Sequence, residues 1–117
     1  AFITRSVIQS SRFLQEMERA AVVAREGAGV IKLHFQQDRL AFHASAPDIG
    51  TIDGSMGILH QGEDIEVVYN SKYIIEVLKA IEGDSLYMEL TGPVTPGIIT
   101  SDADENFLYL ILPVRIG

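Results

Sequence analysis

Apolar and polar residues follow the same order of patterns twice along the chain. A short β-branched segment opens each copy, at residues 7–8 and again at residues 65–68, and such residues favour strands. A polar pair comes next, Ser10 with Ser11 in the first copy and Asn70 with Ser71 in the second. Short polar side chains suit a helix N-terminus, so we expect a helix to begin at each pair.

Apolar residues after each polar pair recur at helical spacing. Those of the first copy are Phe13, Met17, Ala20, Ala21 and Ala24, and those of the second are Ile74, Val77, Leu78 and Ile81. This spacing places them on one side of a helix, which predicts that each helix buries one face. Glycine can terminate a helix, so we expect the helices to end near Gly27 and Gly83.

Alternating apolar and polar residues after each helix predict β-hairpins, at residues 31–45 and 86–100. A third strand is expected to close each copy, at residues 55–59 and 107–112. The predicted order is therefore strand, helix and three strands, twice. This order predicts an α+β domain with two helices gathered on one side of antiparallel sheets.

A constant shift of sixty residues aligns the two copies. It matches Val7 with Val67, Ser11 with Ser71, Arg12 with Lys72, Phe13 with Tyr73, Glu16 with Glu76, Arg19 with Lys79 and Ala20 with Ala80. Apolar, aromatic and charged positions agree together, which indicates an internal repeat. We expect one domain over residues 1–117, built from repeats at roughly 3–60 and 61–117.

The composition is that of a globular, soluble protein with a substantial core. The chain has 117 residues, of which 47% are hydrophobic, and no cysteine. The sequence shows no signal peptide and no apolar run long enough to span a membrane, so we expect a cytoplasmic protein. Because it has no cysteine, we expect no disulfides. Because it begins at Ala1 rather than at methionine, we also expect a domain taken from a longer protein.

The net charge of −7 argues at first against a nucleic-acid partner. The predicted helices and the residues just after them hold five basic and five acidic side chains, so the excess of acid lies elsewhere. Arg12 with Arg19, and Lys72 with Lys79, are seven residues apart and share a helix face, which a polyanion could approach. The alternative is a solvated helix surface with pairs such as Lys72 and Glu76.

No motif of catalysis or metal binding is found. His34, His43 and His60 lack metal-ligand spacing, and the acidic turn with Asp102, Asp104 and Glu105 lacks the calcium-loop pattern. The glycines at residues 27–29 fit a helix stop better than a phosphate loop, and no serine stands in a nucleophile elbow. We expect no catalytic residue, no metal and no cofactor.

Four segments together resemble a known family. They are FLQEMERAAVVAREG (13–27), YNSKYIIEVLKAIEG (69–83), LTGPVTP (90–96) and LYLILPVRI (108–116). In this order and spacing they are similar to the C-terminal third of the bacterial DNA polymerase III β subunit, the sliding clamp, over nearly all of residues 3–116. The resemblance implies a DNA clamp fold in a homodimeric ring on duplex DNA. Helices would line the hole, and this chain would be the third of three domains.

The resemblance also implies three functional surfaces. A groove that docks short peptides of the polymerase catalytic subunit, the clamp loader and repair proteins would include Asn70, Tyr73, Val94, Pro96, Leu110, Leu112, Pro113, Val114 and Arg115. The surface toward DNA would hold Arg12, Arg19, Lys72 and Lys79. The subunit contact would involve Val22, Val23, Asp48 and Asp53, in a stretch that holds fewer acids than is usual in the family. From composition alone, Leu110 and Leu112 would instead be core residues.

The expected function is that of a processivity factor, a non-catalytic subunit of the DNA polymerase III holoenzyme. Its contacts with DNA would be independent of sequence, because a closed ring holds the duplex topologically. The alternative is an α+β domain that binds or converts a small molecule in an apolar groove. The sixty-residue duplication separates the two hypotheses, since the clamp requires it and an enzyme does not.

Overall fold

Two antiparallel sheets and two helices make up the fold of the computed structural model, which describes residues 4–103, 106 and 108–115. The elements in chain order are β1 (Thr4–Gln9), α1 (Ser10–Ala24), β2 (Val30–Gln36), β3 (Arg39–Ala46), β4 (Gly50–Gly57), β5 (Leu59–Gln61), β6 (Ile65–Asn70), α2 (Ser71–Ala80), β7 (Ser85–Leu90), β8 (Gly97–Ser101) and β9 (Tyr109–Ile111). The strand orders are β5-β1-β7-β8-β9 and β4-β3-β2-β6. The predicted α+β class with helices against antiparallel sheets is confirmed.

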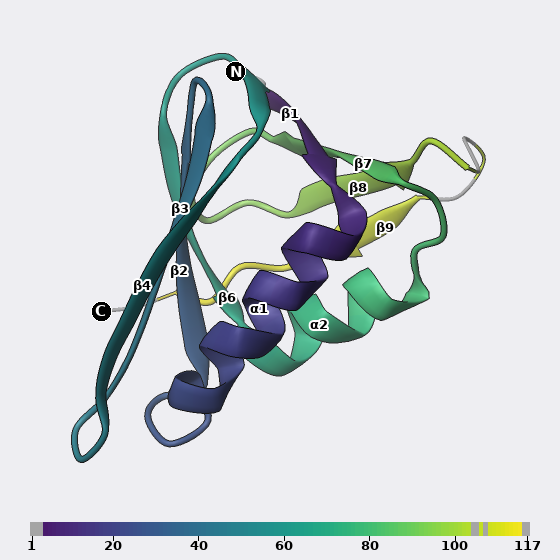
Figure 1. The fold of residues 1–117 in the computed structure, drawn as a ribbon. Coiled ribbons are helices and arrows are strands. Elements are labelled where there is room, and N and C mark those ends of the chain that lie inside the picture. The colour runs from purple at the N-terminus through teal and green to yellow at the C-terminus, as the bar shows by residue number, and fades with distance from the viewer. Residues whose placement is uncertain (1–3, 104–105, 107, 116–117) are drawn as a thin grey trace.

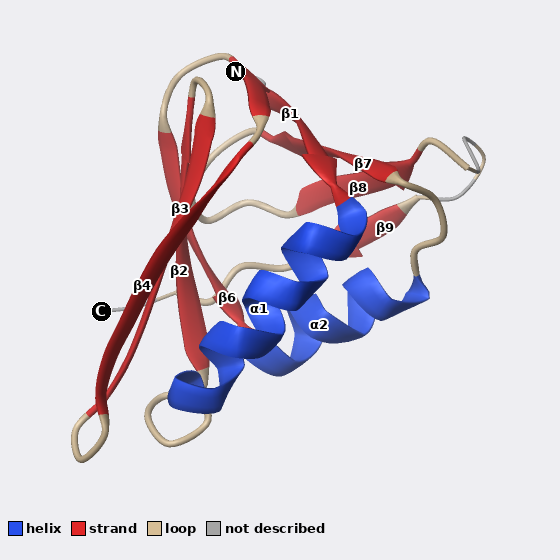
Figure 2. Ribbon diagram, in the orientation of Figure 1, coloured by secondary structure: helices blue, strands red, loops and turns tan. Residues whose placement is uncertain are grey.

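Each half of the chain contributes its first strand to the sheet of the other half. β1 pairs with β7 over six residue pairs, and β6 pairs with β2 in the same way. The sheets diverge in a V, and the two helices lie side by side across its open side (Figures 1 and 2). Because of this exchange of strands, neither half can complete its sheet alone.

The helices run antiparallel, and two backbone hydrogen bonds hold their starts. The amide of Ser71, the first residue of α2, donates to the carbonyl of Gly29 just after α1, at 2.9 Å. The amide of Ser10, the first residue of α1, donates to the carbonyl of Asp84 just after α2, also at 2.9 Å. Each helix therefore begins beside the end of the other.

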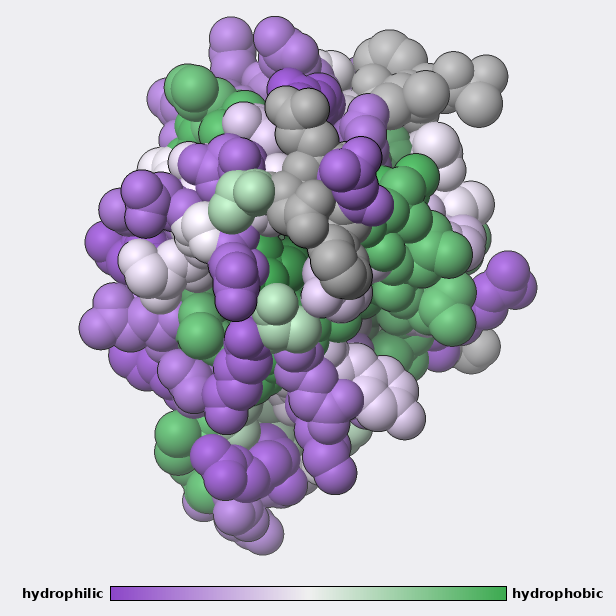
Figure 3. All heavy atoms as spheres, turned by 90° about the vertical axis from the view of Figure 1, so that its right-hand side faces the viewer, coloured by the Kyte–Doolittle hydropathy of each residue, from purple (hydrophilic) through white to green (hydrophobic). Residues whose placement is uncertain are grey.

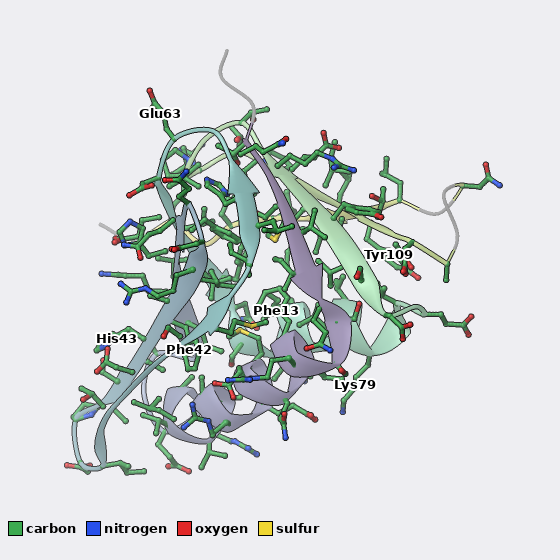
Figure 4. The ribbon with its side chains drawn as sticks, turned by 45° about the horizontal axis from the view of Figure 1, so that its top comes forward. Phe13, Phe42, His43, Glu63, Lys79 and Tyr109 are labelled. Carbon is green, nitrogen blue, oxygen red and sulfur yellow. The ribbon has the colours of Figure 1, made fainter. Side chains whose placement is uncertain are left out.

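The core lies between the helices and the inner faces of both sheets. The predicted stripe of α1 is confirmed: Phe13, Met17, Ala20, Ala21 and Ala24 are all buried, and Phe13 points inward from α1 (Figure 4). On α2, Ile74 and Leu78 are buried, whereas Val77 is only partly buried. Burial of a large apolar side chain contributes about 1.5–3 kcal/mol, so the helices are held mainly by this packing.

The structural repeat has a shift of 61 residues rather than the predicted 60. At a shift of 60, Phe13 would correspond to Tyr73, but Phe13 is fully buried and Tyr73 is 61% exposed. At 61, Phe13 corresponds to the buried Ile74 and the strand residue Ile8 to the buried Tyr69. Arg12 and Arg19 therefore do not correspond to Lys72 and Lys79, and their matching spacing does not arise from the repeat.

The two helix N-termini differ in their caps. Asn70 precedes α2, and its Oδ1 accepts hydrogen bonds from the amides of Lys72 at 3.0 Å and Tyr73 at 3.2 Å, as a capping residue does. Gln9 precedes α1 and makes no side-chain cap. The predicted capping role of Asn70 is confirmed, and the prediction of a polar cap at Ser10 and Ser11 is wrong.

The helix ends and the third strands also depart from the prediction. The helices end at Ala24 and Ala80, and the first glycine with a positive φ is Gly29 at 77° rather than Gly27. Instead of one strand at 55–59, two strands are present, β4 and β5. In the second copy β9 is shorter than predicted, and Phe107, the predicted start, lies outside the described residues. No helix in the described part of the chain could cross a membrane.

Candidate functional site

The last strand, β9, exposes a row of leucines. It pairs with β8 through Ile99 with Tyr109, Ile98 with Leu110 and Gly97 with Ile111, and within the described residues it forms the edge of its sheet. Ile111 faces the core, whereas Leu110 and Leu112 are 61% and 68% exposed. The core-packing alternative for Leu110 and Leu112 is therefore wrong.

A third leucine in this row was missed by the sequence interpretation. Leu108 is also exposed, and it stands at the spacing of two that places Leu108, Leu110 and Leu112 on one side of an extended chain. Figure 3 views the molecule from the side of β8 and β9 and shows a cluster of apolar atoms on this part of the surface. The alternation of exposed leucines was the signal that identifies Leu108.

The tail after β9 crosses to the other sheet. Pro113 has no amide hydrogen, but the amide of Val114 donates to the carbonyl oxygen of Val68 on β6 at 2.8 Å. Pro113 and Val114 are partly buried and Arg115 is exposed. The tail therefore joins β9 to a point three residues before the start of α2.

The other residues of the predicted docking groove adjoin β9 and the tail. The turn between β7 and β8 holds Val94 and Pro96, both exposed, and Gly97 immediately after it pairs with Ile111. α2 packs against β9, and its first turn carries Tyr73, whose side chain is exposed. Asn70, which caps α2, is partly buried. The fold thus brings the three predicted segments to one side of the molecule.

Gly97 and Tyr69 support this surface from below. A Cβ atom at Gly97 would lie 2.8 Å from Leu90 Cδ2, 3.2 Å from the Tyr69 hydroxyl and 3.3 Å from Ile111 Cγ2. Tyr69 is fully buried, and its hydroxyl has no hydrogen-bond partner among the described residues. Burial raises the pKa of the Tyr69 phenol. The site therefore rests on a tightly packed base with one unsatisfied hydroxyl.

The predicted cations of α1 are tied to one carboxylate. Glu16 is buried and pairs with Arg12 at 3.5 Å and with Arg19 at 2.8 Å. The Arg19 guanidinium also lies 5.7 Å from the ring centre of Phe42, which points from β3 toward α1 (Figure 4). Arg12 and Arg19 are thus partly neutralised and lie on the β3 side of the helix.

The predicted cations of α2 lie elsewhere, beside the groove between the two helices. Lys72 and Lys79 both line this groove, and Lys79 Nζ is 3.9 Å from Glu18 Oε2 on α1. The expected pair between Lys72 and Glu76 is not among the ion pairs of the described residues. α2 itself carries one net positive charge, and α1 is neutral, because Arg25 and both Glu26 and Glu82 lie beyond the helix ends.

The predicted subunit contact lies at the far end of α1. Val22 is exposed and Val23 is half-buried against the core. The segment after α1 approaches the turn that follows β3, because a Cβ at Gly27 would lie 2.3 Å from the Ser45 carbonyl. Asp48 is exposed in this turn, and Asp53 on β4 is paired with His43 at 2.7 Å. One end of the molecule therefore carries all four predicted residues.

The histidines and the acidic turn form no metal site in the part of the chain that the structure describes. His60 is buried, and both of its ring nitrogens are hydrogen-bonded, Nδ1 with Ser6 Oγ at 2.6 Å and Nε2 with the carbonyl oxygen of Glu63 at 2.7 Å. Asp104 and Glu105 of the acidic turn lie outside the described residues.

Comparisons with known proteins agree with this arrangement. The sequence profile described as "DNA polymerase III beta subunit, C-terminal domain" matches residues 2–115. The Bacillus subtilis beta sliding clamp is 31% identical over 115 residues, which cover 96% of this chain and 30% of the relative. The Staphylococcus aureus beta sliding clamp is 34% identical over 110 residues, covering 92% and 29%. The chain thus spans about a third of the length of these relatives.

Solved structures show the same fold. The DNA polymerase III beta subunit of Thermotoga maritima has a TM-score of 0.94 at 25% identity, covering all of this chain and 32% of that one. The sliding clamp structure from Bacillus subtilis has a TM-score of 0.92 at 30% identity, with the same coverage of both chains. These matches favour a clamp domain over a small-molecule-binding enzyme. The profile match over residues 2–115 shows that this chain belongs to the family of the DNA polymerase III beta subunit, C-terminal domain.

Proposed function

We propose that this chain is the third domain of a ring-shaped processivity clamp that encircles duplex DNA. The profile match across residues 2–115 carries this proposal, and the two side-by-side helices support it. In the proposed ring the helices face the duplex and the sheets form the outer wall. Two copies of the full-length protein, each with three such domains, close the ring in the cytoplasm.

The face toward DNA is proposed to include Arg12, Arg19, Lys72 and Lys79. Because a closed ring cannot fall off the duplex, contacts with phosphates can be weak and independent of base sequence. The near neutrality of the two helices in a chain of net charge −7 supports this face as the one that approaches the polyanion. The domain itself is proposed to be non-catalytic.

The apolar surface formed by β9, its tail, the β7–β8 turn and the start of α2 is proposed to dock short peptides of the polymerase, the clamp loader and repair proteins. Exposed leucines beside a few polar groups are typical of a peptide anchor site. Val94, Leu110, Leu112 and Val114 provide the apolar contacts, and Asn70, Tyr73, Pro96, Pro113 and Arg115 form the rim. The middle domain would supply the opposite wall.

The subunit contact is proposed at the end of α1 and the neighbouring β4, through Val22, Val23, Asp48 and Asp53. The exposure of two large apolar side chains, Val22 on α1 and Ile49 in the turn before β4, supports an apolar contact here. With only two acids in this stretch, apolar packing rather than salt bridges would carry the closure of the ring.

A peptide titration tests the docking surface. The full-length protein is titrated with a fluorescent peptide that contains glutamine and bulky apolar residues, and binding is followed by anisotropy. Leu112→Asp places a charge in the anchor site, and we expect a loss of about 30-fold or more in affinity, the size of a hot-spot contact. Leu59→Asp on β5 is the matched control, since Leu59 is 69% exposed and is not part of the proposed surface. Equal affinity of Leu112→Asp and the parent protein would refute the docking surface.

A further inference from the structure

The groove between α1 and α2 is lined by basic residues that include Arg25, which is not among the predicted DNA-facing residues. It has a volume of about 490 Å³. The charged residues that line it are Glu18, Arg25, Lys72, Glu76 and Lys79. These side chains carry one net positive charge, since three are basic and two are acidic.

The antiparallel register of the helices places like charges opposite each other at one end of this groove. Glu18 and Lys79 face each other with Nζ 3.9 Å from Oε2. Seven residues are about two helical turns. Two turns beyond Glu18, at the end of α1, lies Arg25, and two turns before Lys79, at the start of α2, lies Lys72. Because the helices run antiparallel, both steps lead to the same end of the groove. The Ser71–Gly29 backbone hydrogen bond holds these two ends together.

Neither Arg25 nor Lys72 has a carboxylate partner within 4 Å among the described residues. Arg25 Nε donates to the carbonyl of Ala21 at 3.3 Å, which orients the guanidinium and leaves its terminal nitrogens available. The other cations of the helices, Arg12, Arg19 and Lys79, each have a carboxylate partner. Two unpaired cations that oppose each other repel, and an anion between them would remove that repulsion.

We infer that Arg25 and Lys72 hold a backbone phosphate of the threaded duplex at this end of the groove. This inference rests on the proposed clamp function and adds Arg25, a residue outside the predicted set. The guanidinium can bind a phosphate through two parallel hydrogen bonds, and the lysine acts as a point charge. The phosphate is the ligand rather than a base, so the contact does not depend on sequence.

The salt dependence of DNA binding by the full-length protein tests the inference. The affinity for a short linear duplex is measured by anisotropy at several salt concentrations. Each phosphate contact contributes about 0.9 to the slope of log affinity against log salt. We expect Arg25→Ala/Lys72→Ala to lower the magnitude of this slope by about one or more, and by more than Arg12→Ala/Arg19→Ala does.

Lys32→Ala/Arg39→Ala provides the matched control, because it removes the same charge far from the groove. Lys32 pairs with Glu66 on the sheet face opposite the helices, and Arg39 lies at the β2–β3 turn. A slope of Arg25→Ala/Lys72→Ala equal to that of the parent or the control would overturn the inference.

Retention of the same proteins on closed circular DNA separates this inference from the function on which it rests. A parent protein that stays on circular DNA while the slopes do not differ would refute the phosphate site alone. A parent protein that leaves circular and linear DNA equally fast would refute the clamp function, and the inference with it.

Discussion

The amide of Val114 donates a 2.8 Å hydrogen bond to the carbonyl of Val68, and this bond ties the tail of one sheet to the edge strand of the other. Val114→Pro removes the donor but keeps an apolar side chain. We expect it to lower the free energy of unfolding by about 1 kcal/mol, since one backbone hydrogen bond is lost, and to weaken peptide docking.

Val114→Ala retains the amide and serves as the control for the loss of side-chain contact. Chemical denaturation and the peptide titration measure both effects. If both variants docked the peptide with the affinity of the parent protein, the tail would not be part of the docking surface.

The helix caps predict different responses to alanine at equivalent positions. Asn70→Ala removes the acceptor for the amides of Lys72 and Tyr73, and we expect a loss of about 1 kcal/mol in the free energy of unfolding. Gln9→Ala should have almost no effect, because Gln9 makes no side-chain cap. Equal losses in the two variants, measured by urea denaturation, would contradict this account of the helix starts.

Two glycines at strand ends, Gly97 at the start of β8 and Gly57 at the end of β4, predict different results. Gly97→Ala forces a methyl group to within 2.8 Å of Leu90 and close to Tyr69, so we expect a loss of about 1–3 kcal/mol from overpacking. Gly57→Ala meets no atom within 4 Å, and its φ is not positive, so its stability should match that of the parent within about 0.5 kcal/mol. A stable Gly97→Ala would mean that the base of the docking surface is loosely packed. Thermal and urea unfolding measure the difference.

The buried Tyr69 predicts a loss of stability at alkaline pH. Burial raises the pKa of its phenol in the folded state, whereas in the unfolded chain the phenol ionises near pH 10. Protons therefore leave the unfolded state first, so the stability contribution is complete below about pH 10. It is lost above that pH, at up to about 1.4 kcal/mol per pH unit.

Tyr69→Phe should abolish this alkaline loss. It should also be close to neutral or stabilising at pH 7, because the hydroxyl has no hydrogen-bond partner among the described residues. Tyr87→Phe, at a half-buried tyrosine on the outer face of the other sheet, is the control for removing a hydroxyl. Urea denaturation at pH 7 to 11 measures the three proteins, and an unchanged alkaline loss in Tyr69→Phe would contradict the assignment.

The sequence patterns identified the fold class because the same side chains that set local periodicity also form the core. The stripe of Phe13, Met17 and Ala20 is visible in the sequence and is buried in the structure. The register of the repeat was missed by one residue, because Tyr73 resembles Phe13 chemically although it faces outward. Periodicity indicates which residues share a helix face. It does not show which of two chemically similar residues, such as Phe13 and Tyr73, is the buried one.

The placement of the candidate site depended on contacts between distant segments. The exchange of β1 and β6 between the sheets, and the bond from Val114 to Val68, bring the start of α2 beside the tail. Periodicity along the chain contains no information on such pairings. The segments of the docking surface were identified through family resemblance. Leu108 was missed although leucine recurs at every second position from 108 to 112. Arg25 was missed because no pattern within its own segment distinguishes it from an ordinary surface residue.

The central proposal is that a closed ring holds the duplex, and a comparison of closed and cut DNA tests it most directly. Full-length labelled protein is loaded on circular duplex DNA by its clamp loader, and its release is followed before and after a restriction enzyme opens the circle. We expect slow release from the closed circle and rapid release once the DNA has ends, because the ring slides off. Equal release from both forms would contradict it.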